Sequence, residues 1–560
     1  MEFLDARRLT GPSLLFDGPA AILDVACTAG EAERLEAVWR THVGHMHETL
    51  GWAACDFSRH DLVGGVSLAF TASIDALYAA SEINEWAWAM CDAEFNGAAS
   101  PDFSENVATL RASIAEEANG ELLALQAAST QHGVSFLWDD DEASLGLGRS
   151  SQTWPVGELP DAEAIEWEAY SDVPIGLVTG TNGKTTTVRL ATHILRGSDL
   201  NVGLSSTDWI AVNDRIIDRG DWSGPGGARA VLRQNDVDVA ILECARGGLL
   251  RRGLGVERAD AALITNIAED HLGDFGSQNL DELLNIKWIV SRAVREQGSL
   301  ILNADDELLA GKSASFPGVI TWFSLRNDNP LLQAHVDAGG LAFVLDGDEL
   351  IKIENKVYEL ICHDHQVPIA LGGAARHNIA NALAAAALTW SLGSSLADIR
   401  AGLTSMSQDE NPGRCNIYDV NGRKVLVDFA HNPHAMQAVF DMARSLPARR
   451  RVLCFGQAGD RPDELIRELA RDGWAIGVER VVVSELAIYH RGREEGEVFA
   501  VIQSELMRLG ATADQIAHYD EETQSLVAAL SWAEPGDLVI MLALGGAEPI
   551  QEQLRAMGAS

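Results

Sequence analysis

The chain lacks several features that mark whole classes of protein. Its 560 residues contain no CxxC pair, no fixed-period repeat and no low-complexity tract. They also contain no run of about 18 consecutive apolar residues, the length that a membrane-spanning helix needs. The first residues, MEFLDARRLTGPSLLF, have no basic stretch followed by a long apolar one. These absences argue against a zinc ribbon, a repeat protein, a membrane span and a secretory signal.

Cysteine and positive charge are both scarce. Seven scattered cysteines fit reduced, mostly buried thiols, so we expect a cytoplasmic protein without a disulfide framework. The 42 Lys and Arg residues face 82 Asp and Glu residues, which leaves a formal net charge of −40. That charge argues against duplex nucleic acid or an anionic membrane as a partner. It promotes solubility, and it favours a cationic substrate only weakly.

What the chain does have is enough apolar sequence for several folded domains. Hydrophobic residues make up 47% of it and charged residues 22%, as in globular proteins. Residues 1–168 carry alanine- and glutamate-rich helical patterns without a recognisable ligand loop. We expect an α-rich α+β domain there, which ends in a polar, proline-bearing segment that reads as a linker, SSQTWPVGELPDAEAIEWEAYSDVP.

Two α/β regions are predicted after the linker, at residues 169–410 and 411–560. The first contains the short apolar runs IGLVTG, VDVAILEC, ADAALITNI and GSLILNADD, each followed by a helical pattern. The second contains KVLVDFAHNP, RRVLCFGQAGD, ERVVVSEL and GDLVIMLALGG. Buried runs that alternate with helices indicate parallel sheets. Ligands of such sheets bind beyond the carboxyl ends of the strands.

A phosphate-binding loop is predicted where the first run meets a helix, in GLVTGTNGKTTTVRLATHIL. Glycines let backbone N–H groups turn toward phosphate oxygens, and the helix N-terminus adds positive potential. Lys184 can neutralise the β and γ phosphates, and the Thr185 hydroxyl can ligate Mg²⁺. The usual pattern has glycine where this chain has Val178, so an ordinary glycine turn is the alternative. The loop residues are Gly180, Thr181, Asn182, Gly183, Lys184, Thr185 and Thr186.

Acidic side chains follow other strands of the same predicted sheet. Glu243 ends VDVAILEC, where it can hold Mg²⁺ opposite the loop threonine or simply be a solvated strand end. Asp270 and His271 follow the strand in TNIAEDHLGDFGS, and a histidine there can ligate a metal or orient a carboxylate. The NADD segment offers Asn303, Asp305 and Asp306, which could equally cap a helix.

The order of these motifs resembles the Mur ligase family. TGTNGKTTT, LECARGGLLRRGLG, TNIAEDHLG, LNADD, RHNIANALAA, NPGR and DFAHNP succeed one another across about residues 172 to 560. ARGGLLRRGLG, GDRPDE and RGREEGE resemble in particular the Mur-like half of the cyanophycin synthetases. The resemblance implies a central phosphate-loop domain with a parallel sheet and a mobile Rossmann-like C-terminal domain. The N-terminal region resembles theirs more faintly, and their ATP-grasp domain is missing between the two.

The resemblance also implies roles for residues that spacing alone does not reveal. It implies that Lys287 is carbamoylated and binds a second Mg²⁺ ion, with a plain helical lysine as the alternative. His271 and Glu243 match metal-binding positions of the family. The positions that match nucleotide contacts are His377, Asn378, Asn381, Arg414 and Asp428. Those that match mobile loops around the site are His431, Asn432, Asp460 and Arg461.

The activity that the resemblance implies is ATP-dependent, ADP-forming amide-bond formation. An acceptor carboxylate is activated as an acyl phosphate and then attacked by an amine, such as an amino acid. Without the ATP-grasp domain we expect a single addition, with arginine as a candidate amine and an acceptor that is small or made by a separate enzyme. The N-terminal domain would recognise that acceptor or mediate self-association into a homo-oligomer. An ATPase that moves a partner, and a non-catalytic binding protein, are the alternatives.

Overall fold

The computed structural model describes residues 1–270 and 278–559, which form two compact units. The first unit holds residues 1–267, the described residues from 278 to 323, and residues 384–398. The second holds residues 268–270, 324–383 and the described residues from 399 onward. The expected domain boundaries after residues 168 and 410 stay a prediction.

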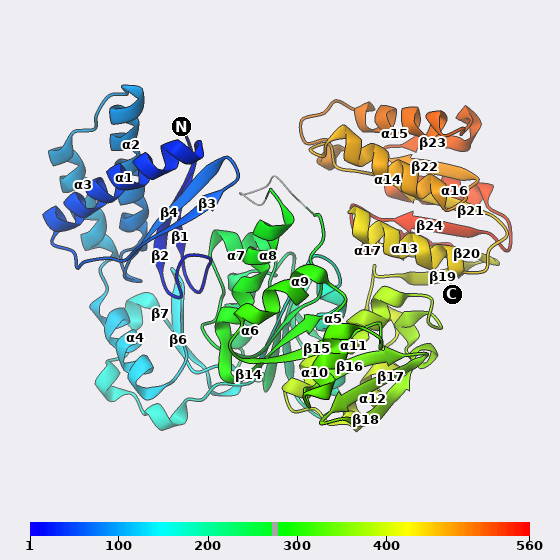
Figure 1. Ribbon diagram of the computed structural model, residues 1–560, viewed down its shortest axis with the longest axis horizontal. Coiled ribbons are helices and arrows are strands. Elements are labelled where there is room, and N and C mark those ends of the chain that lie inside the picture. Colours follow the sequence, from blue (N-terminus) through cyan, green and yellow to red (C-terminus); the bar gives the residue numbers. More distant parts are fainter. Residues whose placement is uncertain (271–277, 560) are drawn as a thin grey trace. The chain divides into compact units, whose positions relative to one another are not determined.

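An antiparallel sheet with the strand order β1-β2-β4-β3 organises the N-terminal part of the first unit (Figure 1). Alternate residues of its central strands, such as Leu23 and Phe70, face a core shared with three helices. Trp39 lies in that core, and its indole N–H donates to Asn84 Oδ1 at 3.0 Å. The elements are β1 (Glu2–Leu9), β2 (Ala20–Ala26), α1 (Ala29–Leu50), β3 (Phe57–Leu62), β4 (Gly65–Thr71), α2 (Leu77–Asn96) and α3 (Phe103–Glu117).

The segment that reads as a linker is folded. It contains β7 (Gln152–Pro155), which completes a small antiparallel sheet of order β5-β6-β7, and three short 3-10 turns. Trp154 and Trp167 pack against the core beneath α4. The aromatic side chains thus supply the apolar surface that this otherwise polar segment buries against the core. The neighbouring elements are α4 (Gly120–His132), β5 (Phe136–Trp138) and β6 (Glu142–Leu145).

A mainly parallel sheet forms the rest of the first unit, in the order β11-β10-β9-β12-β8-β13-β14-β15. The four apolar runs expected to be strands are β8, β12, β13 and β14, and they pair in parallel as predicted. The strands are β8 (Ile175–Thr179), β9 (Val202–Ser205), β10 (Trp209–Val212), β11 (Arg215–Arg219), β12 (Val239–Glu243), β13 (Ala259–Ile264), β14 (Val294–Asn303) and β15 (Val319–Ser324). The helices are α5 (Lys184–Arg196), α6 (Pro225–Leu232), α7 (Arg246–Arg251), α8 (Leu280–Trp288) and α9 (Glu307–Lys312).

The second unit contains an antiparallel hairpin pair and a six-stranded sheet of order β19-β20-β24-β21-β22-β23. The antiparallel strands are β16 (Ala342–Asp346), β17 (Glu349–Glu354) and β18 (Val357–His363). The other strands are β19 (Asn416–Val420), β20 (Arg423–Asp428), β21 (Arg451–Phe455), β22 (Arg480–Ser484), β23 (Ile516–Tyr519) and β24 (Leu538–Leu542). The helices from residue 324 onward are α10 (Pro330–Asp337), α11 (Arg376–Ser391), α12 (Leu396–Ser405), α13 (Pro433–Ser445), α14 (Asp463–Ala475), α15 (Glu497–Arg508), α16 (Glu522–Trp532) and α17 (Ala547–Ala556).

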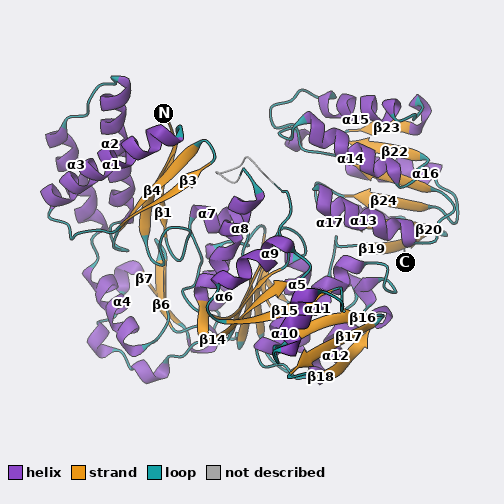
Figure 2. Ribbon diagram, viewed as in Figure 1, coloured by secondary structure: helices purple, strands orange, loops and turns teal. Residues whose placement is uncertain are grey.

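Alternating side chains give the six-stranded sheet two cores. Leu426 and Leu453 lie in a cluster with residues of α13, α14 and α15. Their neighbours Val427 and Cys454 lie in a different cluster, with residues of α16 and α17. The sheet is therefore a layer between two layers of helices (Figure 2), which confirms the expected Rossmann-like architecture.

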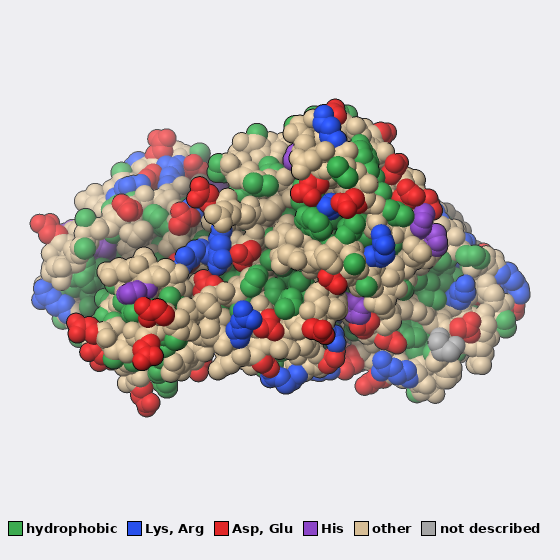
Figure 3. Space-filling view, turned by 90° about the horizontal axis from the view of Figure 1, so that it is seen from below, with side chains coloured by type: hydrophobic (Ala, Val, Ile, Leu, Met, Phe, Trp, Pro, Cys, Tyr) green, Lys and Arg blue, Asp and Glu red, His purple; other side chains and the backbone are tan. Residues whose placement is uncertain are grey.

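Two further expectations concern the whole chain. All seven cysteines are free, and Cys91, Cys362, Cys415 and Cys454 are buried, as predicted. In the described part of the chain, no helix combines the length and the apolar character needed to cross a membrane. On the face drawn in Figure 3, acidic and basic side chains are interspersed.

Candidate active site

The predicted phosphate-binding loop connects β8 to α5 and depends on two glycines. Gly180 and Gly183 have φ angles of 144° and 86°, which side-chain-bearing residues rarely adopt. A Cβ atom on Gly180 would lie 1.8 Å from Thr265 Oγ1. The turn is therefore closed to larger residues, which is what a loop that bends around a phosphate requires.

Asn266 holds this loop in place, and sequence reasoning did not single it out. Its backbone oxygen accepts from Thr181 N at 2.9 Å, and its Oδ1 accepts from Asn182 N at 3.0 Å. Its Nδ2 donates to Asn182 O at 3.0 Å, and Thr265 Oγ1 donates to the same oxygen at 2.6 Å. Asn266 follows β13, the strand next to β8. The sequence signal that could have indicated Asn266 is its place in the TNIAEDHLG motif, directly after a predicted strand.

Glu243 lies at the end of β12, where two hydroxyl groups contact its carboxylate. Thr185 Oγ1 donates to Oε2 at 3.0 Å, and Thr207 Oγ1 donates to Oε1 at 2.7 Å. Glu243 is 1% exposed, so this carboxylate is not a solvated strand end. One carboxylate with two hydroxyls is the oxygen-rich donor set that suits Mg²⁺. Thr207 was not predicted.

Two lysines contact the backbone of the loop. Lys184 Nζ donates to Thr181 O at 3.0 Å from the first position of α5. Lys287, in α8, is 3% exposed, and its Nζ donates to Gly180 O at 2.8 Å. The fold thus brings Lys287 to the loop, although the two are 107 residues apart in sequence. The third predicted catalytic residue, His271, lies outside the described residues.

The NADD segment is a helix cap. Asp306 Oδ1 accepts from Leu308 N and Leu309 N at the start of α9, and its Oδ2 accepts from Ile267 N at 2.6 Å. Asn303 Nδ2 donates to Thr265 O at 3.1 Å. These side chains fix the ends of β13 and β14, which positions the residues that contact the loop.

In the second unit, the side chains of His377 and Asp428 meet at Cys415. The Cys415 thiol donates to Asp428 Oδ2 at 3.1 Å, and its sulfur lies 3.1 Å from His377 Nε2. Asp428 also accepts from Cys415 N at 2.8 Å and from Ala430 N at 2.7 Å. Burial lowers the pKa of His377, and burial together with Asp428 raises the pKa of the Cys415 thiol well above its ordinary value. The thiol is therefore protonated, so it positions Asp428 and is not a nucleophile.

The remaining predicted nucleotide contacts lie on neighbouring segments of this unit. Asn378 Nδ2 donates to Ile369 O at 2.9 Å, and Asn381 Nδ2 donates to Asn378 Oδ1 at 3.2 Å. Both asparagines are buried near the start of α11. The guanidinium of Arg414 lies over the Phe429 ring, 4.9 Å from its centre.

Two of the predicted mobile loops contribute nitrogen-bearing side chains that approach Asp270. His431 Nε2 lies 3.8 Å from Asp270 Oδ1, and an Arg461 nitrogen lies 4.0 Å from the same oxygen. The Asn432 side chain instead caps α13 by accepting from Ala435 N at 2.9 Å.

Two segments that carried the family resemblance also contact each other. Asp460 of GDRPDE pairs with Arg491 of RGREEGE at 2.8 Å.

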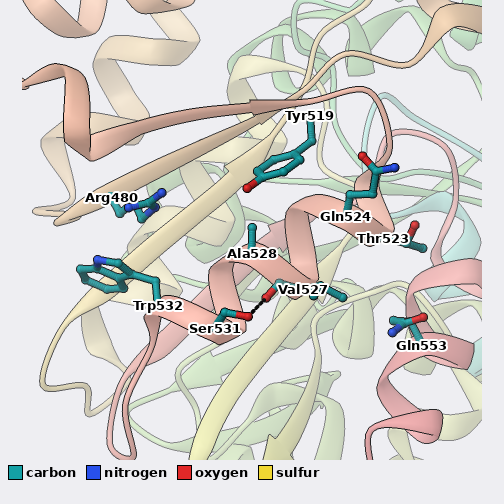
Figure 4. A pocket seen from close by; sticks show the side chains of 9 residues that line it. All are labelled: Arg480, Tyr519, Thr523, Gln524, Val527, Ala528, Ser531, Trp532 and Gln553. Atoms are coloured by element: carbon teal, nitrogen blue, oxygen red, sulfur yellow. Dashed lines mark hydrogen bonds between the residues drawn. The ribbon is translucent and has the colours of Figure 1, made fainter.

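A pocket of about 770 Å³ opens on the C-terminal sheet between β22, β23, α16 and α17 (Figure 4). Arg480, Tyr519 and Trp532 line it together with Thr523 and Gln524. None of the predicted site residues lines this pocket. This pocket is therefore separate from the set of residues that make up the candidate site, so its volume does not help to locate that site.

Comparison with known proteins agrees with the arrangement of these motifs. Residues 178–389 match the Mur ligase middle domain, and residues 413–545 match the Mur ligase glutamate ligase domain. Cyanophycin synthetase from Trichormus variabilis is 36% identical over 377 residues, which cover 67% of this chain and 42% of the relative. The chain thus matches less than half the length of that relative.

Two more distant similarities point to the same fold. UDP-N-acetylmuramoyl-L-alanyl-D-glutamate–L-lysine ligase from Staphylococcus epidermidis is 24% identical over 409 residues, which cover 71% of this chain and 77% of the relative. The solved structure of E. coli FolC in complex with DHPP and ADP has a TM-score of 0.51 and 19% sequence identity, and it covers 68% of this chain and 89% of that one.

Proposed function

Because the chain carries two Mur ligase domains and belongs to the Mur ligase family, we propose that it is an ATP-dependent ligase that joins a carboxylate to an amine. The observation that carries this proposal is the cluster of Thr185, Thr207 and Glu243 beside a phosphate loop whose turn depends on glycines with positive φ angles. It supplies hydroxyl and carboxylate oxygens beside the place where a nucleotide's terminal phosphates would bind.

The proposed reaction has two steps. An oxygen of the acceptor carboxylate attacks the γ-phosphorus of ATP, the bond to the β,γ-bridging oxygen breaks, and ADP leaves. The amine then attacks the carbonyl carbon of the acyl phosphate, loses a proton and expels phosphate, which leaves an amide. This chain contributes positioning and charge neutralisation to both steps.

Each loop residue has a role in this scheme. Lys184 balances the negative charge that builds on the transferred phosphoryl group. Gly180, Thr181, Asn182, Gly183 and Thr186 form the turn and helix start that face the phosphates. Thr185 and Glu243, with His271, would hold Mg²⁺, which when bound neutralises phosphate charge.

The second unit would supply the base and sugar contacts. We assign His377, Asn378 and Asn381 to the adenine and ribose, and Arg414 and Asp428 to phosphate and ribose. The hydrogen bonds that Asp428 accepts from Cys415 and Ala430 support this assignment, because they fix the carboxylate in one orientation. The loop residues His431, Asn432, Asp460 and Arg461 would help to exclude water, which would otherwise hydrolyse an acyl phosphate.

We further propose that Lys287 acts as a carbamate. A carbamate carries two oxygens and a negative charge, so it could hold a second metal ion where an ammonium could not. The burial of Lys287 against the loop supports this role, since its Nζ lies 2.8 Å from Gly180 O, beside the predicted phosphate site.

The proposed amine is cationic, with arginine or lysine as the first candidates. The net charge of −40 favours a cation, and one similar protein is named as an L-lysine ligase. The proposed acceptor is a small carboxylate compound or a peptide. The sequence has one phosphate-loop motif of this kind, so we propose one type of amide bond per cycle.

The test measures phosphate release by the purified chain with ATP and Mg²⁺, across carboxylates such as aspartate and β-aspartyl peptides and amines such as arginine and lysine. We expect release only when both substrates are present, together with one product mass step. Lys184→Ala should abolish release while the far-UV spectrum stays unchanged and the melting temperature changes little, because Lys184 is only partly buried and its Nζ donates to one backbone oxygen, Thr181 O.

Three outcomes would contradict these proposals in different ways. Release that needs no carboxylate or no amine would indicate an ATPase. A ladder of alternating additions would contradict the single amide bond alone. Normal ligation by Lys184→Ala would remove the proposed site.

A further inference from the structure

A cluster of histidine and aspartate side chains lies at one end of the β17–β18 hairpin, apart from the candidate active site. Asp348 lies in the turn before β17, and Asp364 and His365 directly follow β18. One donor atom of each lies within 4.8 Å of the donor atoms of the other two. We propose that Asp348, Asp364 and His365 bind a divalent transition-metal ion.

The backbone fixes the two segments that carry these ligands. Glu349 of β17 is paired with His363 of β18, so the residues beside this pair are held next to each other. Asp364 N donates to Asp348 O at 2.8 Å, which extends the ladder by one bond to the ligands themselves. The close approach of the three side chains thus follows from strand register.

A fourth side chain orients the ligands. His363 Nδ1 lies 3.1 Å from Asp348 Oδ2, and the His363 ring stacks on the His365 ring with centres 5.4 Å apart. Metal-binding groups commonly have a histidine–carboxylate partner of this kind, which fixes their orientation. His363 is therefore a positioning residue in this site.

The electrostatic setting also favours a cation. In the described part of the chain, the two carboxylates lie within 4 Å of histidine nitrogens and pair with no lysine or arginine. Two carboxylates that lie this close repel each other, and a bound divalent ion would relieve that repulsion.

The donor types select the kind of metal. One imidazole nitrogen and two carboxylate oxygens suit Zn²⁺ and its neighbours, whereas Mg²⁺ and Ca²⁺ prefer oxygen alone. In a tetrahedral zinc site the donors lie about 3.4 Å apart. Asp348 and His365 are 62% and 57% exposed, so no packed core opposes the small movement that would close that gap.

The ion would stabilise the segment that leads to α11. A Cβ atom on Gly373, which has a φ of 89°, would lie 2.7 Å from Asp364 Oδ2, so this carboxylate packs against the loop before the helix. Binding at Asp364 would hold that loop, and we therefore expect the metal to raise the melting temperature of the protein.

The experiment titrates the chelator-treated full chain with Zn²⁺ by calorimetry, without nucleotide. The Asp348→Asn/His365→Ala variant should bind one Zn²⁺ ion fewer than the wild type and should lose the rise in melting temperature. His363→Gln should keep the stoichiometry and bind about 10–100-fold more weakly. The control is Asp346→Asn, an exposed carboxylate at the end of β16, two residues before Asp348, which should behave as the wild type.

The proposal fails if the double variant binds as many Zn²⁺ ions as the wild type with the same affinity. It also fails if the wild type binds no Zn²⁺, or if Zn²⁺ raises the melting temperature of both proteins equally. Because the two substituted side chains are exposed, the double variant should fold, and its far-UV spectrum checks this.

Discussion

At the scale of single residues, burial separates the candidate active-site groups from ordinary surface charges. Glu243 and Lys287 are 1% and 3% exposed, yet each reaches the phosphate loop with its charged end. Buried charges are costly unless they are paired or serve a ligand. These two positions are therefore where substitutions should affect chemistry most.

Lys287→Ala should be nearly inactive, because it removes the proposed carbamate, and acetate or another small carboxylate should restore part of the activity. Lys287→Arg is the matched control, since it keeps a cation that cannot be carbamoylated, and it too should be inactive. Carbon-13 NMR with labelled bicarbonate should show a carbamate signal in the wild type and none in either variant. An active Lys287→Arg protein would contradict the carbamate.

The sequence predicted some of these residues and missed others for a physical reason. Glu243 was predictable, because an acidic residue at the end of a buried run faces the ligand edge of a parallel sheet. Thr207 and Asn266 were not, because each depends on which strands are neighbours. Thr207 follows β9, which lies next to β12 only in the folded sheet.

At the scale of elements, the phosphate loop is held by the segment that follows β13. Asn266 makes side-chain and backbone hydrogen bonds to two consecutive loop residues. Local sequence explains why α5 starts where it does, but the shape of the loop depends on this long-range contact.

Asn266→Ala should raise the KM for ATP about tenfold, because it removes two side-chain hydrogen bonds worth about 0.5–1.5 kcal/mol each. The overall fold should persist. Asn96→Ala, at an exposed helix end in the N-terminal part, is the control and should leave the KM unchanged. Steady-state kinetics with varied ATP measure the KM of both variants. An unchanged KM in Asn266→Ala would show that nucleotide binding does not depend on the hydrogen bonds from the Asn266 side chain to the loop.

The least well predicted elements are those whose structure depends on packing contacts that the composition of the segment does not reveal. Apolar runs gave the parallel strands reliably, because buried strands need continuous hydrophobic residues. The segment around Trp154 and Trp167 has a polar composition but packs against the core beneath α4. One of the helical patterns of residues 1–168, ENVATLRASIAEEANGELLALQAAST at residues 105–130, divides between α3 and α4, because the Asn119 side chain caps α4 by accepting from Leu122 N at 3.0 Å.

At the scale of the whole molecule, the N-terminal part and the phosphate-loop sheet belong to one compact unit. Arg233, just after α6, pairs with Asp139 at 2.7 Å and with Glu142 at 3.0 Å in the β5–β6 hairpin. Thr10 N donates to Arg252 O at 2.8 Å. The N-terminal part is therefore fastened to the sheet that carries the candidate site.

Arg233→Ala should lower the free energy of unfolding by about 1–3 kcal/mol, because its carboxylate partners lose a largely buried guanidinium. The control is Arg149→Ala, which breaks another contact between the same two parts, with Asp238, through a side chain that is 68% exposed. That loss should be below about 1 kcal/mol. Urea denaturation measures both, and equal effects would show that burial does not set the strength of this attachment.

The bonds from Asn266 to Thr181 and Asn182 also bear on the thermodynamics of nucleotide binding. Ordering the backbone of a loop costs about 1–2 kcal/mol of conformational entropy for each residue. A loop that is already held by its own protein has lost most of that freedom before any ligand arrives. Nucleotide binding would then lose little conformational entropy in this segment. The favourable enthalpy of the phosphate contacts would therefore contribute almost fully to the binding free energy.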